Sequence, residues 1–131
     1  MKEYVLDTHA FLWWAARPKQ LGGAAARALR QVDAGRALAW VPSIVGVELS
    51  LLAESGRLGL GAAELQAATL RNSSLRILPH DLEQALQFAL LRSLKDPFDR
   101  MIVAAARATH RPLLTADERI ANSGLVEVVW D

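Results

Sequence analysis

Two aspartates three positions apart, Asp96 and Asp99, stand at the beginning of an apolar helical stretch, with Pro97 between them. Apolar residues fall three, four and seven positions after Asp99, which is the spacing of a buried helical stripe. We therefore expect the carboxylate of Asp99 to point toward the protein at the N-terminal end of that helix. A carboxylate in such a place needs a partner, and a bound divalent cation is the simplest one.

Two further aspartates directly follow predicted strands. Asp7 comes after a short apolar strand over 4–6, and Asp117 comes after another over 113–114. Ligands of parallel α/β sheets bind beyond the carboxyl ends of the strands, which places both carboxylates on one rim of the sheet. Each aspartate is also a good N-cap for the helix that follows, and capping alone accounts for its presence.

Glu48 is the fourth acid, and it lies inside an apolar helix predicted over 44–53 with Ser43 as its cap. A glutamate there either reaches solvent or has a buried partner. Carboxylates gathered on one rim repel one another, and the chain offers no evident basic partner for them. Mg²⁺ or Mn²⁺ prefers carboxylate oxygens and suits the hydrolysis of phosphodiesters. The residues alone therefore indicate metal-dependent phosphoester chemistry, with helix capping as the competing interpretation.

The elements that must position these acids are short apolar strands alternating with helices. Strands are predicted over 4–6, 37–41, 75–78, 113–114 and 126–130. Helices are predicted over 9–16, 24–33, 44–53, 62–70, 81–92 and 97–108, with a short one after Asp117 and a glycine-rich turn over 56–61. This alternation is typical of an α/β layer fold with a mainly parallel sheet. The chain has 131 residues without an internal repeat or linker, so we expect a single domain over 1–131.

Three helices have apolar patterns that bear on packing. The helix over 81–92 has the spacing of a buried stripe, made by Leu82, Ala85, Leu86, Ala89 and Leu90. The helix over 44–53 is apolar around nearly its whole circumference, which predicts a contact with a second subunit or another partner. The run Phe11–Trp14 has four large apolar residues in succession, so at least one of them must be exposed or lie in an interface.

Composition excludes several kinds of site. The chain has no cysteine, so neither a disulfide nor a thiolate zinc site is possible. No second histidine stands at ligand spacing from His9, and we expect a surface or hydrogen-bonding role for it. The net charge of +1 gives no general attraction for nucleic acid. The first residues lack the apolar core of a signal peptide and no apolar run reaches membrane-spanning length, so we expect a cytoplasmic protein with no membrane contact.

Four runs of the chain, taken together and in order, resemble the signature of PIN-domain nucleases, and most closely that of VapC-type toxins from bacterial toxin–antitoxin pairs. The runs are Val5–Trp13, Ser43–Leu49, Asp96–Ala104 and Leu113–Asp117. The resemblance implies a three-layer PIN-like domain, with a central parallel sheet of about five strands in the order 3-2-1-4-5 wrapped by helices. It also implies an endoribonuclease that depends on Mg²⁺, with Mn²⁺ as a substitute, and hydrolyses RNA phosphodiester bonds.

By position, the resemblance assigns roles to the acids and to hydroxyl side chains near them. The residues that match the catalytic acids of the family are Asp7, Glu48, Asp99 and Asp117. The residues that match supporting positions are Asp96, Thr8, Ser43 and Thr115. We expect Asp7 and Asp99 to hold the principal cation. The other two catalytic acids complete the ring, and either orient the attacking water or hold a second metal.

The resemblance also implies partners. One is a VapB-type antitoxin whose C-terminal segment lies along a groove at the first helix and blocks the metal site. The other is a second copy of the chain, because homodimers are usual in this family. Arg100 stands next to Asp99, where it either touches a phosphate or pairs with Asp96.

Three alternative functions remain at this point. A housekeeping PIN-domain nuclease that processes RNA without an antitoxin would have the same fold and acids. A non-catalytic interaction module would use the acids as helix caps. A phosphatase of the haloacid-dehalogenase type is disfavoured, because it needs an aspartate two positions after its nucleophile and His9 occupies that place.

Overall fold

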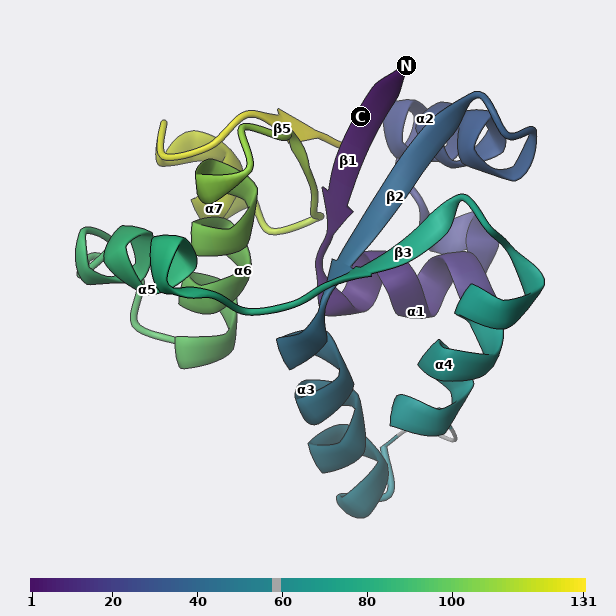
Figure 1. Cartoon of the computed structure of the whole chain (residues 1–131), viewed down its shortest axis with the longest axis horizontal. Coiled ribbons are helices and arrows are strands. Elements are labelled where there is room, and N and C mark those ends of the chain that lie inside the picture. The colour runs from purple at the N-terminus through teal and green to yellow at the C-terminus, as the bar shows by residue number, and fades with distance from the viewer. Residues whose placement is uncertain (58–59) are drawn as a thin grey trace.

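The computed structural model of the chain describes residues 1–57 and 60–131 (Figure 1). Five parallel strands form one sheet in the order β3-β2-β1-β4-β5. The strands are β1 (Lys2–Leu6), β2 (Ala37–Pro42), β3 (Leu75–Leu78), β4 (Leu113–Leu114) and β5 (Val128–Val129). The predicted sheet and its strand order are confirmed. The glycine-rich turn expected over 56–61 falls partly outside the described residues.

The strand β1 lies at the centre of the sheet and brings two neighbours into register. It pairs with β2 from Lys2↔Ala37 to Val5↔Trp40, and with β4 through Val5↔Leu113 and Leu6↔Leu114. Its last three residues are buried, as expected for a strand covered on both faces. Because β1 and β4 run in the same direction, the residues that follow them emerge at one edge of the sheet.

Helices cover both faces of this sheet. They are α1 (Thr8–Ala16), α2 (Gly23–Asp33), α3 (Ser43–Glu54), α4 (Ala62–Arg71), α5 (Leu82–Ala89), α6 (Pro97–Ala108) and α7 (Glu118–Asn122), with a 3-10 turn η1 at Pro18–Gln20. Figure 1 shows α1, α2 and α4 on one side of the strands, α5 and α6 on the other, and α3 extending from the end of β2. The predicted three-layer α/β arrangement is confirmed. Each described helix is too short or too polar to cross a membrane.

The helix α6 begins and packs as its sequence predicts. Oδ1 of Asp96 accepts hydrogen bonds from the backbone N–H groups of Phe98 at 2.8 Å and Asp99 at 3.1 Å, so Asp96 is the N-cap. The residues Ile102–Ala106 are buried against the sheet and the neighbouring helices. This cap and this buried face fix the direction in which Asp99 leaves the first turn.

The expected orientation of α5 is wrong. Its large leucines face solvent, with exposed fractions of 74% for Leu82, 56% for Leu86 and 68% for Leu90. The inward residue is Gln84, which is buried, and its side-chain amide donates a hydrogen bond to the carbonyl of Pro79 at 2.8 Å. Because that polar group is satisfied, its burial costs little, and the helix turns its leucine stripe outward. The helix also ends at Ala89, before the predicted end at residue 92.

The helix α3 divides its apolar circumference between the core and solvent. Val45 and Leu49 are fully buried, whereas Val47 and Leu51 are 51% and 49% exposed. The predicted contact of this helix with a second subunit or another partner stays a prediction, and the exposed side chains of Val47 and Leu51 are the apolar surface available for it. The expected cap is wrong, because Ser43 is the first helical residue and Pro42 occupies the N-cap position without a side-chain hydrogen bond.

Candidate functional site

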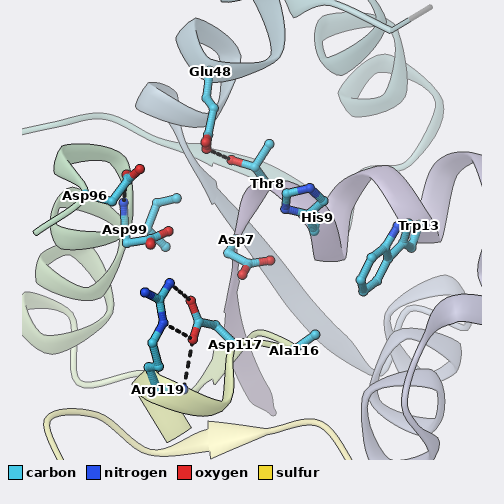
Figure 2. A pocket seen from close by; sticks show the side chains of 11 residues that line it. Asp7, Thr8, His9, Trp13, Glu48, Asp96, Asp99, Ala116, Asp117 and Arg119 are labelled. Carbon is cyan, nitrogen blue, oxygen red and sulfur yellow. Dashed lines mark hydrogen bonds and ion pairs between the residues drawn. The ribbon is translucent and has the colours of Figure 1, made fainter. Parts of the chain in front are cut away.

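The four predicted catalytic acids line one open pocket at the carboxyl ends of β1 and β4 (Figure 2). Its volume is about 470 Å³. The acids that line it are Asp7, Glu48, Asp96, Asp99 and Asp117. They come from the end of β1, from α3, from the start of α6 and from the start of α7. Residues far apart in the chain are therefore brought together by the sheet topology.

Asp7 lies at the centre of this pocket, between the other acids (Figure 2). Its Oδ1 accepts the backbone N–H of Ala10 at 2.8 Å, and its Oδ2 accepts a hydrogen bond from the hydroxyl of Thr115. Burial raises the pKa of the Asp7 carboxyl, although the hydrogen bonds from Thr115 and Ala10 oppose that rise. The carboxylate is thus held in one orientation by two donors from different elements.

Asp99 enters the pocket from the first turn of α6. Burial is the main reason that its pKa rises to about 6, and repulsion from Asp96, Asp117, Glu48 and Asp7 adds to the rise. The charges that raise the pKa of this carboxyl all belong to other acids of the pocket. A cation placed among them would reverse the repulsion.

Glu48 and Thr8 form the side of the pocket nearest α3. The hydroxyl of Thr8, which is buried, donates a hydrogen bond to Oε1 of Glu48 (Figure 2). Glu48 is therefore held toward the other acids by a residue of α1. The two threonines expected to support carboxylates, Thr8 and Thr115, do contact them, whereas Ser43 is exposed and does not line the pocket.

Asp117 has a basic partner, Arg119, which the spacing of the acids did not reveal. The guanidinium Nη2 of Arg119 lies 3.3 Å from Oδ2 of Asp117, and its backbone N–H donates to Oδ1 at 2.9 Å. Burial raises the pKa of Asp117, but the hydrogen bonds from Arg119 and from the backbone of Ile120 outweigh burial and hold the pKa below its usual value. The expectation that the acids lack a basic partner is wrong for Asp117. An arginine two positions after a capping aspartate was the available signal.

The structure also gives the positions of four further residues in or near the pocket. Asp96 lines the pocket, although one of its oxygens caps α6. Arg100 points away: its Nε donates to the carbonyl of Phe88 at 2.9 Å, and its guanidinium carbon lies 4.0 Å from the centroid of the Phe88 ring. The pairing of Arg100 with Asp96 is therefore not formed. His9 is exposed and lines the pocket, as does Trp13, which the sequence did not single out for the site.

The donor set fits a hard divalent cation, although the ligands are not drawn together around a point. Within residues 1–57 and 60–131, no group of three acidic or histidine side chains is close enough to hold an ion by itself. Mg²⁺ and similar ions keep several waters and bind through one or two carboxylates. Asp7 is oriented by two hydrogen-bond donors, and the carboxylate of Asp99 is repelled by the four other acids of the pocket.

Comparisons with known proteins indicate one family. The family model of the PIN domain matches residues 4–124. Ribonuclease VapC22 of Mycobacterium tuberculosis (strain ATCC 25618 / H37Rv) is 33% identical over 126 residues, which cover 92% of this chain and 91% of that protein.

Solved structures share the fold. The chain superposes with a TM-score of 0.72 and 17% identity on a structure of VapBC2 from Rickettsia felis bound to a DNA fragment from their promoter, with 98% of this chain and 99% of that chain covered. It superposes with a TM-score of 0.65 and 23% identity on FitAcB from Neisseria gonorrhoeae, with 96% of both chains covered.

Proposed function

The chain belongs to the PIN domain family, and from that membership we propose that it is a Mg²⁺- or Mn²⁺-dependent endoribonuclease that hydrolyses RNA phosphodiester bonds. The observation that carries the proposal is the meeting of Asp7, Glu48, Asp99 and Asp117 in one pocket. The relative that is 33% identical is named a ribonuclease, which supports the substrate class. A bound hard cation explains this cluster of carboxylates better than helix capping does, because capping alone gives the carboxylates no reason to face one another.

We assign the following roles to the side chains, supported by their positions in the pocket. Asp7 and Asp99 hold the principal cation, and the Thr115 hydroxyl and the Ala10 N–H keep Asp7 in its orientation. A bound divalent ion lowers the pKa of water and stabilises charge on the phosphoryl oxygens. Glu48, fixed by Thr8, faces the same space and accepts the proton of the attacking water.

Three other residues complete the site. Asp117 completes the set of acids around the cation and is paired with Arg119 in the free protein. Arg119 is highly exposed, so it is free to turn toward a phosphate of the RNA. Asp96 acts chiefly by capping α6 and so sets the position of Asp99.

We further propose that the chain is the toxin of a VapBC-type pair, with a VapB-type antitoxin as its partner. The relative that is 33% identical is a VapC ribonuclease, and one structure that shares the fold is a toxin–antitoxin complex from Klebsiella pneumoniae. A cytoplasmic location follows from the proposed RNA substrate. Residues 1–131 form a single PIN-like nuclease domain in this proposal. A homodimer accounts for the apolar residues exposed on α3, Val47 and Leu51.

An RNA cleavage assay tests the proposed activity. Single-stranded RNA is incubated with the protein in Mg²⁺, in Mn²⁺ and in excess chelator, and Asp7→Asn serves as the inactive variant. Asparagine still caps α1, so the fold is kept while a charged ligand is lost. We expect metal-dependent cleavage by the wild type and a loss of at least about a hundredfold in the variant. An Asp7→Asn protein that cleaves as fast as the wild type would contradict the proposal.

A second assay separates the toxin from a housekeeping nuclease. Controlled expression of the wild type should arrest growth, and coexpression of the neighbouring antitoxin gene should restore it. Sequencing of the RNA ends left after a short pulse of expression identifies the cleaved RNA. Undisturbed growth together with active cleavage would favour the housekeeping alternative.

A further inference from the structure

We propose that Trp13 is the platform on which an unpaired base of the RNA stacks beside the acidic pocket. The inference rests on the proposed ribonuclease function and names the feature of the substrate that this site recognises, a base free of pairing and stacking. Figure 2 shows Trp13 on the α1 side of Asp7, opposite Asp99 and Arg119. A base resting there would adjoin a phosphate held among the acids.

Three aromatic rings lie side by side on α1 and near it, and two of them, His9 and Trp13, form an aromatic wall of the pocket. The ring centroids of His9 and Trp13 are 5.6 Å apart at an interplanar angle of 52°, and those of Trp13 and Trp130 are 5.8 Å apart at 55°. His9 and Trp13 stand four positions apart on α1, so they share one face of that helix. His9 and Trp13 both line the acidic pocket, whereas Trp130 contacts Trp13 without being part of the lining.

The third ring, that of Trp130, is fixed by the backbone. The carbonyl of Trp130 accepts the N–H of Ala25 at 3.0 Å. Gly22 packs so closely that a Cβ there would lie 2.3 Å from the Trp130 carbonyl oxygen and 2.8 Å from its indole Cδ1. Trp130 is thus held against α2 and supports one side of Trp13. Because Trp13 has this fixed neighbour, its ring loses little conformational freedom when a base stacks on it.

Two arginines lie beyond His9 and Trp13, on the side away from the acids. A second cavity of about 200 Å³ adjoins the pocket, and His9 and Trp13 line both cavities. Arg17 and Arg57, both exposed, line this second cavity. Single-stranded nucleic acids bind where aromatic rings take the bases and flanking cations take the phosphates. The acidic pocket, the aromatic wall and the two arginines follow that order along the surface.

The neighbouring tryptophan provides a contrast. Trp14 is also half-buried on α1, but its indole N–H lies 3.4 Å from Oδ2 of Asp33 on α2, and it lines neither cavity. Both residues are half-buried tryptophans on α1, and they differ in that only Trp13 lines the two cavities. Trp14→Leu is the matched control for Trp13→Leu.

The test is a mutant cycle between the ring and the base. The substrate is a short RNA that the wild type cleaves in Mg²⁺, compared with versions in which one nucleotide next to the scissile bond is abasic. For one abasic position we expect the kcat/KM of the wild type to fall about 5- to 100-fold. Trp13→Leu should show a similar fall on the intact RNA and no further fall on the abasic RNA. Trp13→Phe should keep most of the base dependence, and Trp14→Leu should behave as the wild type.

Two outcomes would overturn the inference. One is that Trp13→Leu and Trp13→Phe are both as sensitive to the abasic nucleotide as the wild type. The other is that no abasic position affects the wild type. Either result, particularly with weaker antitoxin capture by Trp13→Leu, would assign the wall to a protein partner. Failure of the ribonuclease proposal is distinct, because the wild type would then cleave none of these RNAs. Stabilisation of each variant by Mn²⁺, equal to that of the wild type, reports an intact fold.

Discussion

The hydroxyl of Thr115, just after β4, donates a hydrogen bond to Oδ2 of Asp7, just after β1. The same hydroxyl oxygen accepts the backbone N–H of Asp117 at 3.1 Å. One fully buried side chain therefore sets the position of two acids that lie at opposite ends of the chain. Supporting contacts of this kind orient metal ligands, and their loss weakens binding even though they never touch the ion.

Thr115→Val removes this hydroxyl and keeps the shape of the side chain. We expect the Mn²⁺ affinity to fall about 10- to 100-fold, because Oδ2 of Asp7 loses its hydrogen-bond donor. Isothermal titration calorimetry measures the affinity. Thr115→Ser keeps the hydroxyl and should restore most of it. An affinity in Thr115→Val equal to that of the wild type would show that the hydrogen bond does not position the ligand.

Asp99→Asn should make the metal-free protein more stable at neutral pH. Burial, with repulsion from the other acids, raises the pKa of Asp99 to about 6, above its ordinary value of 3.8. Above pH 6 the folded protein holds an unfavourable anion, and the neutral amide removes that cost. After a discount for the solvent that reaches this site, we expect a gain of about 1 kcal/mol, or an increase of about 2 to 5 °C in Tm.

The pH dependence of this gain provides the control. Near about pH 3, below the ordinary value of 3.8, the wild-type carboxyl is mostly protonated in both the folded and unfolded states, so the two proteins should then have nearly equal stability. Thermal unfolding in chelator at about pH 3 and about pH 7.5 makes the comparison. A lower Tm for Asp99→Asn at pH 7.5 would mean that the carboxylate has a stabilising partner in the free protein.

Arg119→Gln should change metal and RNA binding in opposite directions. Arg119 competes with a cation for Asp117, so its removal should tighten Mn²⁺ binding by about two- to fivefold at low salt. The same change should raise the KM for RNA, because an exposed guanidinium beside the pocket is lost. Both effects should shrink at high ionic strength. If both affinities weaken together, Arg119 has a structural role instead.

Leu51→Lys should dissociate the proposed homodimer. Leu51 is 49% exposed on α3 beside other apolar residues, and a charge there would have to be buried in a subunit interface. Sedimentation at micromolar concentration should give a dimer for the wild type and a monomer for the variant. Leu70→Lys, at an 83% exposed leucine on α4, is the matched control and should stay dimeric. A monomeric wild type would remove the proposed interface.

The parts of the structure that follow from sequence are those fixed by strong local rules. Apolar strands alternating with helices determine a parallel sheet, and residues after its strands meet at one edge, which is why Asp7 and Asp117 were placed together. The cap and stripe of α6 predicted that Asp99 points toward the protein, whereas its distance from this edge depends on how the helix packs.

Two kinds of feature could not be predicted: the direction in which an apolar helix face points, and contacts between side chains that are set only by the folded structure. The leucine spacing of α5 defines a stripe but does not say which way it faces, and the buried amide of Gln84 decides it. The pairing of Arg119 with Asp117 depends on how α7 begins. The position of Trp13 depends on Trp130, which comes from the other end of the chain.

The central claim is that the pocket formed by Asp7, Glu48, Asp99 and Asp117 binds a divalent ion. Stabilisation of the fold by the metal tests this claim most directly. An ion that binds only the folded state, present at a free concentration of about a hundred times its Kd, adds about 2.7 kcal/mol to the free energy of unfolding. We predict that millimolar Mn²⁺ raises the Tm of the wild type by several degrees and leaves that of Asp7→Asn unchanged. An equal shift in the two proteins, or none in the wild type, would contradict the account.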